Sequence, residues 1–312
     1  LNNLGEVARH VGDYAASRQQ AEESLALLRE IGHGWQALHP LNNLGMLARI
    51  SGQHAEARRL HQECLAIARD IGDQRNIATA LLRLAAVSMD VGEWQEAREL
   101  HAASLSHYRE IGHLRGIAAC LTSMGQLTLR CGANAVAPRL FEASLEIAQV
   151  IGDRLAVGKA LSGLGWSRGV LGDEALAGRA IGLAFETFTE IQAVPDALQA
   201  LVMTAALLTR TPGDAARLGA TSDRVQPALD VLDLVQRHPA AWHSTRAWAA
   251  RVQAELGAYL PAELTPTPPT GQRETGDVEL KRLGRVALEA WSVSAGPSQS
   301  ARDNPLSQED AR

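Results

Sequence analysis

Apolar and small residues recur along this chain with a period of 40 residues. Six columns keep this spacing through five successive units, and the residue type changes at only a few positions. A fixed period of this length is typical of solenoid proteins, in which each unit buries its apolar face against its neighbours. The columns begin at Leu1, Leu4, Gly5, Gly12, Leu25 and Ile31, and the first of them continues through Leu41, Leu81, Leu121, Leu161 and Leu201.

Each unit predicts two helices joined by a short turn. In the second unit Leu60, Cys64 and Ile67 stand at i, i+4 and i+7, which is the spacing of one face of an α-helix. Gly52 and Gln53 lie just before that stretch. Glycine supplies the left-handed backbone that ends one helix, and the polar residue after it can cap the next. The repeats are therefore predicted to be helical hairpins.

A small residue inside each first helix requires a packing reason. Glycine costs about 1 kcal/mol relative to alanine in a helix interior. We therefore expect a neighbouring helix to approach closely at this column. Its members are Gly5, Gly45, Ala85, Gly125 and Gly165.

The pattern weakens after the fifth unit. The sixth unit keeps Leu201, but Pro227 falls inside its second helix, which must start late or bend. The predicted fold is an all-α solenoid of five clear and one degenerate helical hairpins plus a capping helix. The predicted parts are 1–194 (five repeats), 195–260 (degenerate sixth repeat and capping helix), 261–277 (Pro/Thr-rich linker), 278–291 (short amphipathic helix) and 292–312 (disordered tail).

The repeat resembles the tetratricopeptide repeat family in its long-helix variety. The residues that carry this resemblance have the spacing of the family's large–large–Gly signature and its later Ala. The resemblance implies a right-handed superhelix whose first helices line a concave groove and whose second helices lie outside. These residues are Leu41, Leu44, Gly45, Ala48 and Ala57.

A second resemblance concerns the biological setting. Repeats of the form LNNLG…GD, followed by the ARLGA segment from Ala216 to Ala220, are similar to the C-terminal arms of LuxR-type and MalT-like bacterial signalling ATPases. This resemblance implies a sensor arm that releases an inhibited core. The chain starts part-way into a repeat, so we expect a missing N-terminal portion that could serve as an intramolecular partner.

Composition and charge narrow the class of partner. The net charge is −5 and the sequence pI is ≈ 6.1, so no global basic field favours nucleic acid or anionic lipid. The sequence has no signal peptide and no apolar run long enough to span a bilayer. Its three cysteines form no CxxC pair. We therefore expect a cytoplasmic protein.

The first helices supply the candidate binding residues. Paired asparagines could donate to and accept from the backbone of an extended peptide, although they could also be ordinary polar residues of the repeat. The arginines could hold an acidic partner or simply face solvent, and Trp166 could pack in the core instead. The candidate groove residues are Asn2, Asn3, Glu6, Arg9, Asn42, Asn43, Met46, Arg49, Met89, Gln126, Arg130 and Trp166, with Leu82, Ala86, Thr122 and Ser162 predicted on the same face.

The sequence favours binding over catalysis. No phosphate-binding loop, nucleophile–base arrangement or metal-ligand spacing stands in a supporting context, so we expect no enzyme activity, no cofactor and no metal. His61 and His101 share one column, for which packing or exposure is the preferred interpretation.

Three functional hypotheses remain open at this point. The leading hypothesis is a solenoid that binds a protein or an extended peptide in its groove, as the sensor or scaffold arm of a larger bacterial regulator. The alternative is a small-molecule sensor, which predicts a closed apolar pocket instead of an open polar groove. The third is a purely structural spacer or oligomerisation arm.

Overall fold

The structure is a computed structural model that describes residues 13–30, 34–208, 222–257 and 276–292. Throughout these ranges the elements are helices, and no helix among them is long and apolar enough to cross a membrane. The elements are α2 (Tyr14–Glu30), the 3-10 helix η1 (Gly34–Ala37), α3 (Leu38–Ile50), α4 (His54–Asp70), α5 (Gln74–Val91), α6 (Trp94–Glu110), α7 (Leu114–Arg130), α8 (Ala137–Val150), α9 (Arg154–Val170), α10 (Glu174–Glu190), α11 (Val194–Leu208), α12 (Ser222–Arg237), α13 (His243–Gly257) and α14 (Gly276–Ser292).

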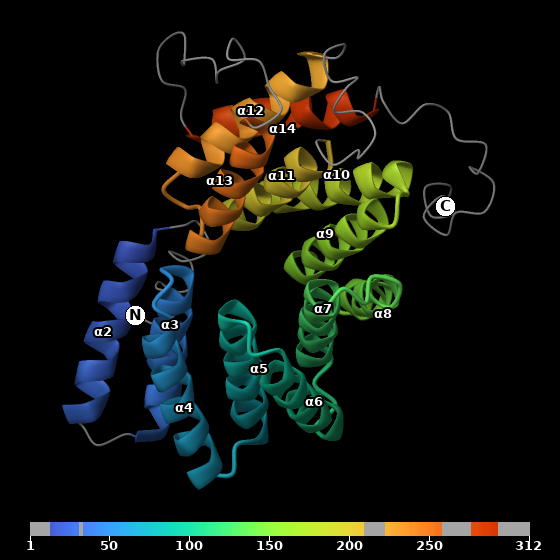
Figure 1. The fold of residues 1–312 in the computed structure, drawn as a ribbon. Coiled ribbons are helices and arrows are strands. Elements are labelled where there is room, and N and C mark those ends of the chain that lie inside the picture. The colour runs from blue at the N-terminus through green and yellow to red at the C-terminus, as the bar shows by residue number, and fades with distance from the viewer. Residues whose placement is uncertain (1–12, 31–33, 209–221, 258–275, 293–312) are drawn as a thin grey trace.

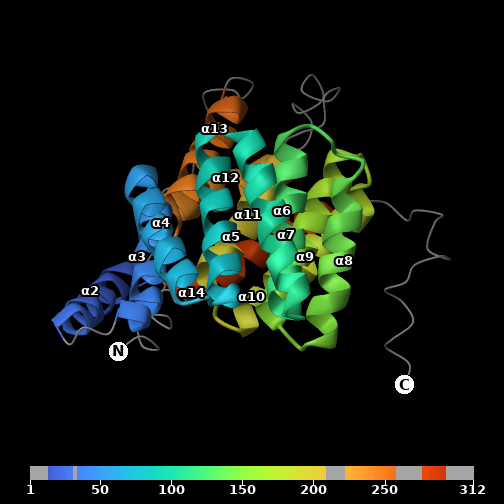
Figure 2. The ribbon, with the colours of Figure 1, turned by 90° about the horizontal axis from the view of Figure 1, so that it is seen from below.

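Successive helices pair into hairpins, and the hairpins stack into a curved solenoid, as predicted (Figure 1). We call α3, α5, α7, α9 and α11 the inner helices, because neighbouring members contact each other directly along the concave side of the curved stack (Figure 1). The helices α2, α4, α6, α8 and α10 are the outer helices. Figure 2 shows the stack from below, with the C-terminal helices behind the first hairpins.

The turns between the helices have the backbone that the glycine columns predict. Gly52 ends α3 with a φ of 77°, and Gly92 ends α5 with a φ of 84°. After Gly52, the backbone N–H of Gln53 donates to the carbonyl of Ala48 at 2.8 Å, which satisfies a free carbonyl at the helix end. Glycine is favoured here because other residues strain in the left-handed region.

The small residues inside the inner helices make room for large side chains of the outer helices. A Cβ atom at Gly125 would lie 2.7 Å from Cζ of Phe141, and one at Gly165 would lie 2.6 Å from Cγ1 of Ile181. Both outer side chains are fully buried. The predicted close approach at this column is confirmed.

The C-terminal part departs from the regular repeat. Pro227 lies inside helix α12, in a column that holds no proline in the five regular units. Helix α14 packs against α10, α11 and α12. The Trp291 indole N–H donates to the carbonyl of Glu174 at 3.0 Å, which fixes the end of α14 on α10.

The curvature brings the two ends of the solenoid together. The Tyr14 hydroxyl, at the start of α2, donates to the carbonyl of Ala240 at 2.6 Å. His243, at the start of α13, covers the turn after α3, because a Cβ at Gly52 would lie 2.9 Å from its Cδ2 atom. The first hairpins therefore contact the capping region across the hollow's edge, which Figure 1 shows at the left.

Candidate functional site

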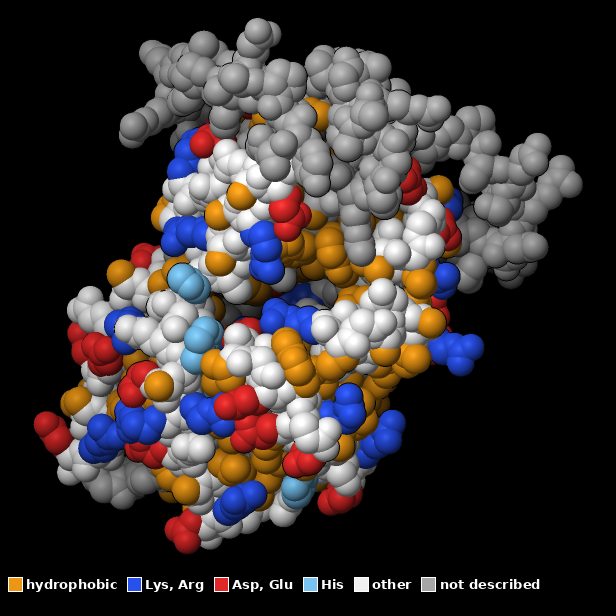
Figure 3. Space-filling model, viewed as in Figure 1, with side chains coloured by type: hydrophobic (Ala, Val, Ile, Leu, Met, Phe, Trp, Pro, Cys, Tyr) orange, Lys and Arg blue, Asp and Glu red, His pale blue; other side chains and the backbone are white. Residues whose placement is uncertain are grey.

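The exposed side of the inner helices forms one continuous surface around the hollow, which we call the inner face. Its side chains recur three or four positions apart along each helix and are mostly polar or basic. Figure 3 shows the hollow from the same side as Figure 1, with Lys or Arg and His side chains at its rim. The inner face comprises Asn43, Met46, Arg49, Thr79, Arg83, Ala86, Asp90, Ser123, Gln126, Arg130, Lys159, Trp166 and Val170.

Several predicted groove residues lie on this face. Gln126 and Arg130 are exposed on α7, and Asn43 and Met46 are half-buried on α3. Trp166 on α9 is also half-buried, and it packs partly against the C-terminal core. The residues Asn2, Asn3, Glu6 and Arg9 lie outside the described residues.

Other predicted groove residues point between the helices instead. Met89 is 4 % exposed and its sulfur lies 3.4 Å from Nε2 of His101. The same correction applies to the whole column that contains Asn42. The exposed side of each inner helix lies about one residue further along the helix than predicted. The buried members of that column are Leu82, Thr122 and Ser162, and Asn42 is half-buried with a buried Oδ1 that has no hydrogen-bond partner in the described part.

Three neighbouring inner helices meet at one carboxylate. Arg49 of α3 donates to Asp90 of α5 at 2.8 Å, and Nη2 of Arg130 on α7 lies 3.9 Å from the same carboxylate. Arg130 also donates to the carbonyl of Met89 at 3.3 Å. The sequence analysis missed Asp90, although an acid 40 residues before a base in one column is a signal for such a contact.

A second junction lies between α9 and the C-terminal helices. Trp166 meets Trp248 of α13 edge to face, with ring centroids 5.0 Å apart. Nearby, Lys159 of α9 lies 3.5 Å from the buried carboxylate of Asp196 on α11. Trp248 therefore adds an aromatic side chain to the end of the inner face, which the repeat pattern alone did not indicate.

Two imidazoles lie buried between the layers. His61 and His101 are fully buried, and burial lowers the pKa of His61 to about 3 and that of His101 to about 4. Arg83 and Arg49 lower the pKa of His61 further, because a second positive charge is unfavourable beside them. Within the described ranges no three His, Cys, Asp or Glu side chains are placed to hold a metal ion.

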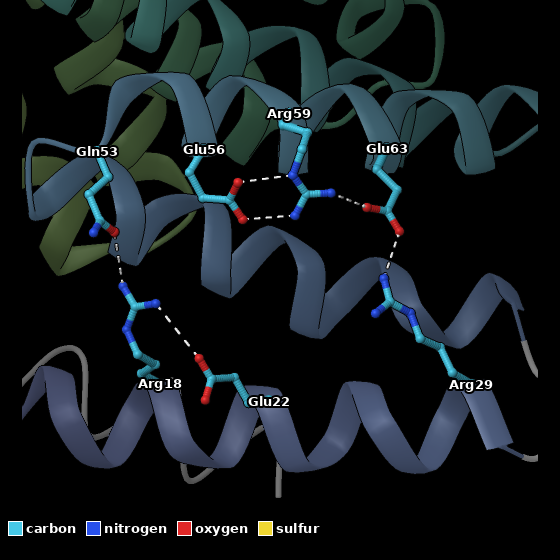
Figure 4. Close-up of polar contacts among 7 residues, drawn as sticks. All are labelled: Arg18, Glu22, Arg29, Gln53, Glu56, Arg59 and Glu63. Atoms are coloured by element: carbon cyan, nitrogen blue, oxygen red, sulfur yellow. Dashed lines mark hydrogen bonds and ion pairs between the residues drawn. The ribbon is translucent and has the colours of Figure 1, made fainter.

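The outer helices use their charges differently. Figure 4 shows α2 and α4 joined by ion pairs and amide contacts along their lengths. Arg29 of α2 donates to Glu63 of α4 at 3.0 Å, and Arg59 pairs with both Glu56 and Glu63 on its own helix. Arg18 donates to Gln53 at 3.4 Å and lies 3.7 Å from Glu22.

Comparison with known proteins supports the helical-repeat architecture. The tetratricopeptide repeat model matches residues 1–70. No curated protein matches the chain significantly. Among solved structures, the chain is similar to a Rap protein complexed with Competence and Sporulation Factor, with a TM-score of 0.61 and 13% identity over 92% of this chain and 74% of that one.

A weaker likeness is to BtubC (BKLC) from P. vanneervenii, with a TM-score of 0.48 and 16% identity over 85% of this chain and 98% of that one. That score is too low to support an argument. The tetratricopeptide repeat match is confined to the first 70 residues, and the likeness to the Rap protein shows the fold of the stacked hairpins.

Proposed function

We propose that this chain is a non-catalytic solenoid that binds an extended segment of a protein or peptide on its inner face. The observation that carries the proposal is the row of half-buried and exposed polar side chains on the inner helices from α3 to α9. Side-chain amides such as Asn43 and Gln126 can each donate to and accept from a peptide unit. An open polar surface of this kind suits an extended chain better than a small apolar ligand.

The structural neighbour supports the same class of function. The Rap protein was solved in complex with Competence and Sporulation Factor, so a solenoid of this shape can carry a bound factor. By analogy, we propose that this chain is the sensor or scaffold arm of a larger bacterial regulator. The unpaired thiols of Cys64, Cys120 and Cys131 support a cytoplasmic location.

A random dodecapeptide library selected on the full chain tests this proposal. The Ala86→Trp variant places a large side chain on the inner face, and Ala102→Trp places the same side chain on the exposed surface of α6. We expect selected peptides to bind the wild type and Ala102→Trp equally and to bind Ala86→Trp about tenfold more weakly, or about 1.4 kcal/mol. Peptides that bind both variants alike would contradict the inner-face assignment, and a library without binders would contradict peptide binding itself.

A small-molecule sensor is the second candidate, and the Trp166–Trp248 pair favours it. Aromatic rings at a junction between α9 and α13 could hold a flat apolar ligand. In that case a Trp248→Ala variant would lose binding of the inducer while Ala86→Trp would keep it. Binding can be followed by tryptophan fluorescence.

A further inference from the structure

Charge is divided unequally between the two layers of the solenoid. Within their bounds the five inner helices carry eight Arg or Lys residues and two acidic residues. The five outer helices carry nine basic and fourteen acidic residues. The acidic caps Asp73 and Asp153 stand at the turns before α5 and α9. A chain with a net charge of −5 thus turns a positively charged surface towards its hollow.

The basic side chains of the inner face outnumber the carboxylates that could neutralise them. Arg49, Arg83, Arg130 and Lys159 lie on this face, whereas its carboxylate neighbours are Asp90 and the buried Asp196, which lies 3.5 Å from Lys159. Asp90 is 12 % exposed and hydrogen-bonds to Arg49, so its charge is largely used within the protein.

The Arg130 side chain is 46 % exposed and touches Asp90 only at 3.9 Å. A guanidinium has five N–H donors in a fork that matches a carboxylate, and the contacts of Arg130 with Asp90 and Met89 leave donors directed to solvent. Arg130 is therefore the strongest point for an incoming carboxylate.

We propose that the segment bound on the inner face is acidic, and that its carboxylates pair with Arg83 and, in competition with Asp90, with Arg130. This inference rests on the proposed function, since it names the chemical class of the same ligand. The separated charges also favour such a partner kinetically, because a positive concave surface concentrates and orients an acidic chain.

The composition of the face fits a polypeptide better than a nucleic acid. Tight nucleic-acid binding relies on about 6–10 phosphate contacts by Lys and Arg, and this face offers fewer cations than that. The side-chain amides of Asn43 and Gln126 lie on the same face as the cations and can bind peptide backbone, whereas the hydroxyls of Thr79 and Ser123 already contact Tyr108 and His101 of α6.

Fluorescence anisotropy with defined probes tests the inference. The probes are fluorescein-labelled dodecapeptides of alternating Glu and Ala, of alternating Gln and Ala, and of alternating Lys and Ala, together with a dodecamer of deoxythymidine. At low salt we expect the Glu peptide to bind about tenfold more tightly than the Gln peptide, and the advantage to shrink as NaCl is added. The Lys peptide and the oligonucleotide should bind more weakly than the Glu peptide.

Matched charge variants locate the effect. Arg83→Gln/Arg130→Gln removes two charges from the inner face, and Arg98→Gln/Arg139→Gln removes two from exposed positions of α6 and α8. We expect the inner pair to lose about tenfold in affinity for the Glu peptide and the outer pair to change it by less than about twofold.

The Asp90→Asn variant should change the affinity for the Glu peptide in the opposite direction. The amide can still accept from Arg49 but no longer competes for the cations, so we expect the Glu peptide to bind about threefold more tightly. A general loss of structure could not produce this gain, and a thermal melt of each variant checks that it is folded.

The outcomes separate this inference from the function on which it rests. Equal affinity for the Glu and Gln peptides, equal losses in the inner and outer pairs, or tighter binding of the oligonucleotide would each overturn the acidic-segment inference. If library peptides bind the inner face but the Glu peptide does not, the inference fails and the binding function stands. If no peptide binds in a way that Ala86→Trp abolishes, the binding function fails as well.

Discussion

The inner and outer helices come from the same 40-residue repeat, yet their charged residues have different neighbours. On the outer helices, acids and bases alternate and meet across the layer, as when Arg58 of α4 reaches Glu96 of α6 at 2.9 Å. On the inner helices the charges are mostly basic, and Arg130 stands half exposed at the hollow. One repeat thus carries two surfaces: the outer one links hairpins to each other, and the inner one is left open to other molecules.

The largest expected effect is a loss of folding stability at low pH, which comes from the two histidines buried between the layers. His61 and His101 have pKa values of about 3 and 4 in the folded chain, below the ordinary 6.5. Between pH 6.5 and the folded-state pKa of each imidazole, the unfolded chain therefore binds more protons than the folded chain. The stability from the neutral imidazoles is fully present above pH 6.5 and is lost as the pH falls. Between pH 7 and 5 each imidazole should cost about 2 kcal/mol of unfolding free energy. Urea unfolding at both pH values measures the loss.

The repeat itself provides the control for this prediction. In the fourth hairpin Phe141 faces Gly125 as His61 faces Gly45 in the second. His61→Phe should remove about half of the pH dependence, and it should not destabilise the protein at pH 7, because both ring nitrogens of His61 are buried without a partner in the described part. An unchanged slope of stability against pH would show that His61 is not the titrating group.

A second prediction concerns the packing distance between the layers. Gly125→Ala places a methyl group 2.7 Å from the Phe141 ring, and overpacking of this kind costs about 1–3 kcal/mol. Gly182→Ala on α10 is the matched change, because its Cβ would meet only Leu288 at 3.8 Å. Helix propensity should make that variant neutral or more stable by about 1 kcal/mol. Equal effects in thermal melts would contradict the tight contact between the layers.

The smallest expected effect is in the outer ion pairs. Arg58 pairs with Glu93 and Glu96 of the next hairpin, 35 and 38 positions on, whereas those positions from Arg98 hold Ala133 and Val136. Arg58→Gln should therefore cost up to about 1 kcal/mol at low salt and less at high salt, and Arg98→Gln should cost less still. Denaturation at 0.05 and 1 M NaCl measures the difference, and a salt-independent loss would indicate packing instead of charge.

The local periodicity predicted the parts of the fold that depend on local spacing. Turns at Gly52 and Gly92 and the close contact at Gly125 follow from residue types at fixed intervals. The direction of each helix face did not follow, because α5 is apolar around most of its circumference. Leu82 and Met89 were therefore assigned to the inner face although both are buried.

The candidate site depends on contacts between units, which one repeat does not specify. Asp90 meets arginines from the hairpins before and after it, and Trp248 reaches Trp166 from beyond the degenerate sixth unit. A charged residue in one column does not indicate its partner until the positions of the neighbouring hairpins are known.

The hydrogen bond from Tyr14 to the carbonyl of Ala240 has a consequence for how this molecule can evolve. An open solenoid can gain or lose a unit with little change to the others. Here the first and last parts touch, so one added 40-residue unit would separate Tyr14 from Ala240 and move His243 away from Gly52. The contact fixes the number of hairpins, and with it the circumference of the hollow, much as closure fixes the strand number of a barrel.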